Sequence, residues 1–171
     1  MARKMKALDD LFLDGLKDIY YAEKKILKAL PKMAKASTVT QLEEAFLTHR
    51  DETEGQIERL EQVFEMLGKR PQGKTCDAID GMIAEGEQVI AEYEGSDAVD
   101  AGLLAAAQAV EHYEISRYGT LKVWAKTLGM NEAGTLLDET LEEEKRTDKL
   151  LTKIAQSAAN KKAGAGRRAA A

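Results

Sequence analysis

Acidic residues stand on the apolar face of a stretch that has the period of a helix. Residues 105–129, AAAQAVEHYEISRYGTLKVWAKTLG, carry apolar residues at steps of three and four. Glu111 and Glu114 lie in the middle of that face. Two carboxylates one helical turn apart in apolar surroundings repel each other, and burying them is costly unless a cation offsets their charge. The pattern therefore indicates either a metal site or a network of paired or protonated acids.

Further acids occupy corresponding positions in three other helical stretches. Residues 5–35, 41–67 and 132–157 show the same period, and the acids on their inner faces are Glu23, Glu52, Glu144 and Asp148. Each acid lies well inside its stretch, so a bundle can bring them to one level. Two divalent ions would offset most of the charge of six core carboxylates. Hard oxygen ligands favour iron, manganese, magnesium or calcium over copper. We predict a dinuclear metal site with these six acids as ligands.

Two other polar residues share these faces. His49 precedes Glu52 by three positions, so it is expected either to bind metal or to hydrogen-bond a ligating carboxylate; plain core packing is the alternative. Tyr118 lies one turn beyond Glu114, and we favour a core tyrosine with a satisfied hydroxyl over a role in oxidation. His112 is adjacent to Glu111 and is expected to point to the surface or to an interface.

The elements that would hold these residues are four long helices and one shorter helix. Residues 75–94 form the shorter, apolar helix without an acid on its inner face, and we interpret it as a crossover. Glycines at 68, 95 and 129 are expected to end helices, and Thr40-x-x-Glu43 is a candidate capping box. The predicted fold is therefore all-α, an antiparallel four-helix bundle with a short crossover helix, over residues 1–157.

Composition and charge limit the classes of function. The chain has 171 residues and a formal charge of −5, which argues against general nucleic-acid binding. Residues 158–171 hold four basic residues and no acid, and we predict a disordered tail that binds nucleic acid weakly at most. Cys76 is the only cysteine, which agrees with a cytoplasmic location. No signal peptide and no apolar run long enough for a membrane span are found.

The chain resembles the YciE/YciF-type ferritin-like proteins, bacterial stress-associated proteins, over about residues 5–156. The stretches that carry the resemblance are DIYYAEKKILKALPKMAKA, AFLTHRDETEGQIERLEQVF, residues 105–129 and LLDETLEEEKRTDKLLTKIA. Wider relatives are the rubrerythrin-like di-iron proteins, whose four bundle helices supply Glu, Glu-x-x-His, Glu-x-x-Glu and Glu-x-x-His. The matching acids here are Glu23, Glu52, Glu111, Glu114 and Glu144.

This chain has no histidine at the histidine positions of the two Glu-x-x-His motifs. Gly55 and Thr147 stand three residues after the second-helix and fourth-helix acids, and Gln56 and Asp148 follow one step later. The resemblance implies a ferritin-like homodimer with two iron ions per chain, manganese being the alternative, and a di-iron oxidase or peroxidase activity. Two alternatives stay open: a stress-induced structural scaffold without redox turnover, and a DNA-associated ferritin relative that uses its basic tail.

Overall fold

Helices account for all regular secondary structure in the part of the chain that the computed structural model describes, residues 5–169, with side chains up to residue 165. This confirms the predicted all-α class. The elements in chain order are α1 (Leu8–Ala36), α2 (Thr40–Met66), α3 (Asp77–Tyr93), α4 (Val99–Thr127), α5 (Asn131–Ile154), a π-helical turn (Ala155–Ala159) and α6 (Asn160–Ala169).

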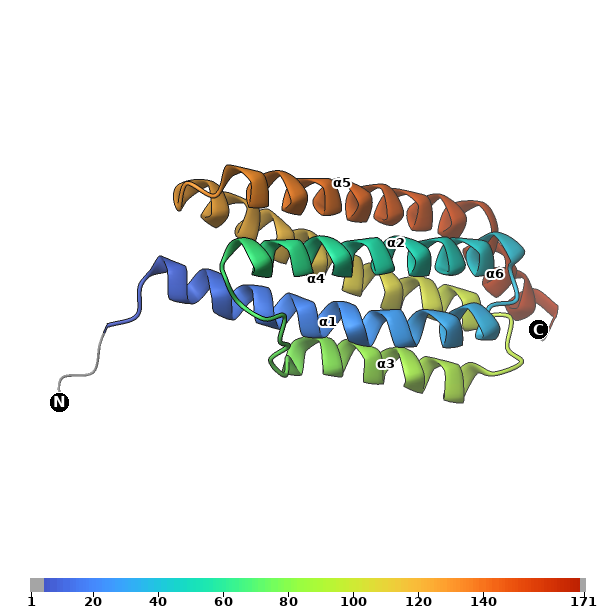
Figure 1. Ribbon diagram of the computed structural model, residues 1–171. Helices are drawn as coiled ribbons and strands as arrows, with labels where there is room; N and C mark the ends of the chain where they lie inside the picture. Colours follow the sequence, from blue (N-terminus) through green and yellow to red (C-terminus); the bar gives the residue numbers. More distant parts are fainter. Residues whose placement is uncertain (1–4, 170–171) are drawn as a thin grey trace.

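The four long helices form the bundle, and α3 lies outside it. Figure 1 shows α1 and α2 as one antiparallel hairpin and α4 and α5 as a second. Helix α3 packs against α1 and α4 and returns the chain along the bundle, so that α4 runs in the same direction as α2. The crossover predicted for residues 75–94 is therefore present, and it leaves the four long helices free to share one core.

Glycine ends three of these helices as the sequence predicted. Gly68, Gly95 and Gly129 follow α2, α3 and α4 with φ of 63°, 76° and 78°. A residue with a Cβ rarely adopts this left-handed conformation, whereas glycine does so without a steric penalty. Gly129 lies in the short connection of the α4–α5 hairpin, whereas Gly68 and Gly95 lie in the connections that lead into and out of α3.

The start of α2 departs from the predicted capping box. Val39 is the N-cap, and its side chain makes no capping hydrogen bond. Asp100, buried in the first turn of α4, instead accepts hydrogen bonds from the backbone N–H of Thr38 at 2.7 Å and of Val39 at 3.3 Å. A tertiary contact thus replaces the local cap and ties the first hairpin to α4.

The disorder predicted for residues 158–171 is not what the structure shows up to Ala169. The chain continues from α5 through the π-helical turn into α6, which contacts α4. Alanine has the highest helix propensity, Ala159 is fully buried, and Lys162 pairs with Asp100 at 3.6 Å. Residues 170–171 lie outside the described part. The bundle therefore extends beyond the boundary predicted at residue 157.

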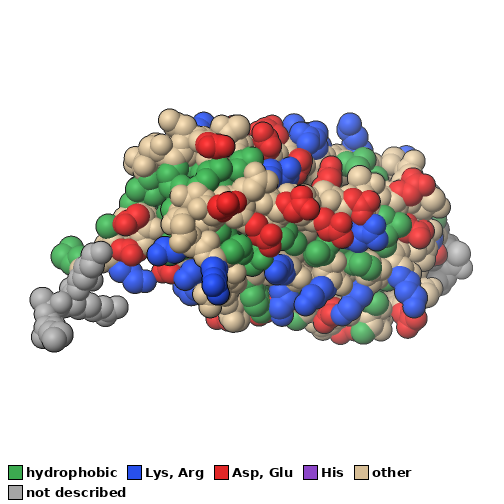
Figure 2. Space-filling model, in the orientation of Figure 1, with side chains coloured by type: hydrophobic (Ala, Val, Ile, Leu, Met, Phe, Trp, Pro, Cys, Tyr) green, Lys and Arg blue, Asp and Glu red, His purple; other side chains and the backbone are tan. Residues whose placement is uncertain are grey.

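The core runs the length of the bundle, and the surface is mixed in charge. Apolar side chains from all four long helices are fully buried, among them Phe12, Phe46, Leu104 and Leu137. On the face drawn in Figure 2, acidic and basic side chains intermingle rather than gather by sign. Among the described helices, none combines the length and the hydropathy needed to cross a bilayer.

Candidate metal centre

Four buried side chains from three helices converge in the middle of the bundle. They are His49 on α2, Glu111 and Glu114 on α4, and Glu144 on α5, and one potential ligand atom from each lies within 4.8 Å of the others. The Nε2 atom of His49 is 3.4 Å from Oε1 of Glu111 and 3.6 Å from Oε2 of Glu144. The helical stretches of the sequence analysis thus do bring their central acids to one level.

Glu23 joins this group from α1. Its side chain is fully buried and accepts a hydrogen bond from the hydroxyl of Tyr118. This contact confirms the interpretation of Tyr118 as a core tyrosine with a satisfied hydroxyl. We call Glu23, His49, Glu111, Glu114 and Glu144 the core cluster, to which each of the four long helices contributes.

Glu52 lies at the edge of the core cluster rather than inside it. Its side chain is 35% exposed, and its Oε2 atom is 3.4 Å from Nδ1 of His49. His49 therefore has a carboxylate on each side, with its Nε2 atom toward the core acids and its Nδ1 atom toward Glu52. Thr147, on α5, also approaches Nδ1 at 3.5 Å. Glu52 is placed to connect the cluster with solvent.

Asp148 is not brought into the core cluster, contrary to the sequence prediction. Its Oδ1 atom accepts a hydrogen bond from Gln108 at 3.0 Å and lies 3.3 Å from Nε2 of His112, whose side chain is 70% exposed. Four residues rotate a position by about 40° around a helix, which here turns the aspartate out of the core toward the outer side of α4. His112 points to the surface, as predicted.

Several polar atoms of the core cluster, and one of the neighbouring Gln56, have no hydrogen-bond partner within the described residues. Each would be costly in a dry core, because a buried acceptor without a donor loses its hydration and gains nothing in return. The partnerless atoms are Glu23 Oε2, His49 Nε2, Gln56 Oε1, Glu111 Oε2, Glu114 Oε1 and Oε2, and Glu144 Oε2.

In the described part of the chain, lysine and arginine side chains do not act as partners for these buried acids. The ion pairs of Glu111 and Glu144 are with His49, and no lysine or arginine there pairs with any of the four core acids. Of the predicted alternative, a network of acids paired with lysine, arginine or tyrosine or held protonated, the described residues show the tyrosine contact of Glu23 but no lysine or arginine pair. Converging carboxylate oxygens with one imidazole are a donor set that suits iron or manganese.

Burial raises the pKa of all four core acids. For Glu23 the pKa rises to about 8, first because of burial and then because of the charge of Glu144. Burial places the pKa values of Glu111 and Glu114 well above the usual range, and it raises that of Glu144. Without a metal ion, the core therefore favours protonated acids at neutral pH.

For the pKa of His49, in contrast to the core acids, the acidic neighbours outweigh burial. Burial lowers the pKa of its imidazole, but the hydrogen bond to Glu52 and the charges of Glu111 and Glu144 outweigh burial and raise that pKa to about 10. The same contact holds the pKa of Glu52 below its usual range. A bound cation would take over the role of the imidazolium and leave His49 free to act as a neutral ligand.

A polar network between α2 and α5 supports Glu144. Gln56 donates hydrogen bonds to Glu144 and, at 3.2 Å, to Glu143. Arg59 donates to Glu143 and, at 2.9 Å, to Thr140. The sequence placed Gln56 one step beyond the position of a missing imidazole, and Arg59, three positions further and thus on the same helix face, was not predicted to take part. Gln56 holds Glu144, and Arg59 anchors that arrangement from the surface.

Comparisons with known proteins agree with this architecture. A model of the family described as "Domain of unknown function (DUF892)" matches residues 7–164. Protein YciF of Escherichia coli K12 is 48% identical over 160 residues, which cover 93% of this chain and 96% of that protein. The crystal structure of the E. coli stress protein YciF superposes with a TM-score of 0.87 and 47% identity, covering 92% of this chain and 99% of the other.

Two further solved structures share the fold. YcfI of Rhodopseudomonas palustris is 47% identical, with a TM-score of 0.84 over 89% of this chain and 97% of that one. A protein of Xanthomonas campestris pv. campestris is 20% identical, with a TM-score of 0.76 over 94% and 99% of the two chains, and supports the fold alone. By its sequence over nearly its whole length, this chain belongs to the DUF892 family and is similar to YciF.

Proposed function

We propose that this chain binds two divalent metal ions, iron in the first place and manganese as the alternative, in the core cluster. The observation that carries the proposal is the set of partnerless carboxylate oxygens and the imidazole nitrogen, all buried and facing one another. A purely structural core would replace such groups with apolar ones at little or no cost in stability. Their presence is accounted for by a ligand that supplies positive charge.

Glu23, Glu111, Glu114, Glu144 and His49 would hold the metal ions. A pair of ferrous ions supplies two electrons, enough to reduce dioxygen to hydrogen peroxide or hydrogen peroxide to water, and oxygen ligands stabilise the ferric state. Such oxygen or peroxide chemistry agrees with the description of the relative YciF as a stress protein. Dioxygen and peroxide stay alternative oxidants at this point.

The surrounding residues orient the ligands and exclude water. Tyr118 fixes one oxygen of Glu23 and leaves the other facing the cluster. Gln56 likewise donates a hydrogen bond to one oxygen of Glu144 and leaves the other facing the cluster. Glu52, exposed on one side and in contact with His49 on the other, is placed to pass a proton between the imidazole and solvent.

Metal content of ligand variants tests the proposal. Glu111→Ala and Glu144→Ala should lose iron yet keep the fold, because removing one carboxylate also relieves repulsion within the cluster. Glu142→Ala is the matched control, since Glu142 lies on the same helix as Glu144 but pairs with Lys145 at the surface. Iron retained in full by both core variants, as in the control, would refute the ligand assignment.

A structural role without redox turnover is the second candidate. The relative YcfI is described as a candidate structural protein, and this chain has no histidine at the histidine position of either Glu-x-x-His motif. Optical absorption after ferrous ion and then air are added separates the two roles. A ferric absorption band that needs Glu144 favours oxygen chemistry, whereas no oxygen-dependent change favours the scaffold. The homodimer expected from the resemblance stays a prediction, for which analytical ultracentrifugation is the test.

A further inference from the structure

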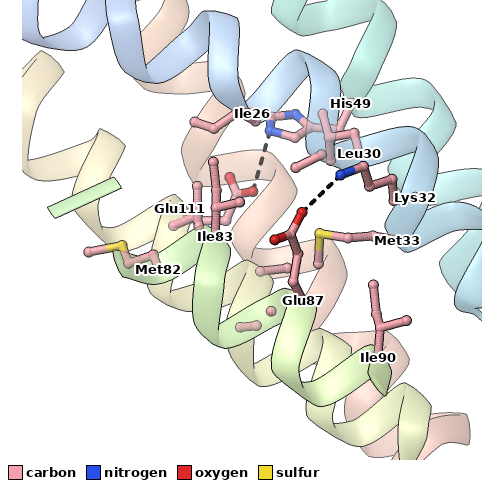
Figure 3. A pocket seen from close by; sticks show the side chains of 15 residues that line it. Ile26, Leu30, Lys32, Met33, His49, Met82, Ile83, Glu87, Ile90 and Glu111 are labelled. Carbon is pink, nitrogen blue, oxygen red and sulfur yellow. Dashed lines mark hydrogen bonds and ion pairs between the residues drawn. The ribbon is translucent and has the colours of Figure 1, made fainter. Parts of the chain in front are cut away.

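A narrow pocket leads from the surface between α1, α3 and α4 to the core cluster. Its inner end is formed by His49 and Glu111, and its walls are apolar side chains from the three helices (Figure 3). At its outer end Lys32 of α1 and Glu87 of α3 form an ion pair at 2.8 Å, with both side chains more than half exposed. A molecule that leaves solvent here therefore crosses an apolar passage before it meets the cluster.

The walls contain no hydrogen-bonding side chain between the two ends. Ile26, Leu30 and Met33 of α1 face Met82, Ile83 and Ile90 of α3, as Figure 3 shows. Water enters a cavity only where it finds polar partners, whereas apolar cavities stay dry and accept apolar atoms and molecules. The apolar walls therefore favour the entry of an apolar molecule over the entry of water or hydrogen peroxide.

The volume of the pocket limits the size of the molecule that can enter it. It leaves about 40 Å³ for the centres of water-sized molecules, a few times the roughly 10–15 Å³ that one water needs. A diatomic molecule fits this space. Gly86 of α3 lines this space, and a Cβ added there would lie 3.7 Å from the Cβ of Ala106.

The group at the inner end is suited to a ligand rather than to the wall of a cavity. His49 is 2% exposed, and its Nε2 atom has no hydrogen-bond partner within the described residues. The opposite side of the same ring faces Glu52, whose carboxylate is reached by water. The cluster thus has two sides of different character, a polar side at Glu52 and an apolar side at the pocket.

We infer that the apolar pocket between α1, α3 and α4 is the site through which dioxygen reaches the core cluster. The inference rests on the proposed function for what the oxygen then meets, but the binding of dioxygen in the pocket does not require metal. Peroxide and ferrous ion, which are polar, approach instead from the side of Glu52. Gly86 is the residue that keeps the pocket open.

The first experiment measures dioxygen in the pocket of the metal-free, full-length protein. Dissolved oxygen is paramagnetic, so it speeds the nuclear relaxation of methyl groups near which it resides. Under oxygen pressure, the methyl groups of Ile83 and Met82 should relax faster than that of Ile19, which is fully buried in the core away from the pocket. Equal enhancement at all three positions would overturn the inference.

Two variants of α3 provide the matched comparison. Gly86→Leu adds a side chain at a residue that lines the pocket, and its Cβ would lie 3.7 Å from that of Ala106, an ordinary contact distance. The change also removes a helix-interior glycine, and urea unfolding checks that the fold is kept. Gly81→Leu makes the same change on the same helix, where an added Cβ meets nothing within 4 Å. The oxygen effect on Ile83 should be lost in Gly86→Leu and kept in Gly81→Leu. Its persistence in Gly86→Leu would overturn the inference.

The rate of ferrous-ion oxidation in the two variants then tests whether dioxygen passes through the pocket to the core cluster. In iron-loaded protein, Gly86→Leu should oxidise ferrous ion more slowly with dioxygen but at an unchanged rate with hydrogen peroxide, relative to Gly81→Leu. Equal slowing with both oxidants, or slowing with neither, would show that dioxygen takes another path. Failure to bind iron would refute the proposed function alone, because the relaxation measurement is made without metal.

Discussion

Replacing Glu23 by glutamine should change how the stability of the metal-free protein depends on pH. Glu23 is fully buried, and its pKa is raised from 4.5 to about 8. A raised pKa in the folded state means that the contribution to stability is complete below pH 4.5 and is lost as the pH rises through 8. Glutamine keeps an oxygen that can accept the hydrogen bond from Tyr118 but cannot ionise.

The size of the effect follows from the shift. One pKa unit corresponds to about 1.4 kcal/mol, so between pH 5 and pH 8 the ionisation of Glu23 costs the folded state roughly 3 kcal/mol relative to the unfolded chain. For a chain of this length that cost amounts to about 6–12 °C in Tm. The wild type should therefore lose about 3 kcal/mol more than Glu23→Gln over this pH range.

Urea unfolding followed by circular dichroism, in chelator at pH 5 and pH 8, provides the measurement. Glu61→Gln is the control, because Glu61 also accepts a tyrosine hydroxyl, that of Tyr20 at 2.7 Å, but is exposed. Glu23→Gln should depart from Glu61→Gln in its pH dependence. If Glu23→Gln behaves like Glu61→Gln, the core acids are not held in the costly environment that the structure indicates.

Four further outcomes are expected. Metal binding near pH 7 should release protons, because the ligating acids hold them in the metal-free core; an unbuffered titration that releases none would contradict the raised pKa values. Gln56→Leu should weaken iron binding, measured by competition with a chelator, since Glu144 loses the donor that orients it; an unchanged affinity would show that Glu144 needs no such support. Asp100→Ala should cost about 1–3 kcal/mol in urea unfolding, because buried N–H groups of the α1–α2 connection lose their acceptor. Lys162→Ala should cost less than Asp100→Ala in the same measurement, because Lys162 is partly exposed and Asp100 keeps the N–H donors of Thr38 and Val39; an equal cost would contradict this.

The periodic parts of the sequence predicted most of the fold and most of the core cluster. Glu23, Glu111, Glu114 and Glu144 could be found because an acid on an otherwise apolar face is costly, and because helices hold their period over many turns. The crossover helix was evident from its apolar face without an acid. Glycines marked the helix ends, because few other residues adopt their backbone conformation.

The predictions that the structure contradicts failed because they depend on contacts between residues far apart in the sequence. Asp148 was assigned to the core by its spacing from Glu144, but its short side chain finds Gln108 and His112 on α4 instead. The cap of α2 comes from Asp100, 62 residues beyond Thr38 in the chain, which no local motif reveals. Helix α6 has a low-complexity sequence, and its alanine content together with the pairing of Lys162 to Asp100 accounts for its order.

An anaerobic titration of the metal-free protein with ferrous ion, with the bound iron counted per chain, tests the central claim most directly. The account predicts tight binding of two ferrous ions per chain in the wild type, and loss of that binding in Glu144→Ala. Absence of tight binding in the wild type would contradict it and would mean that protons and His49 alone hold the core acids.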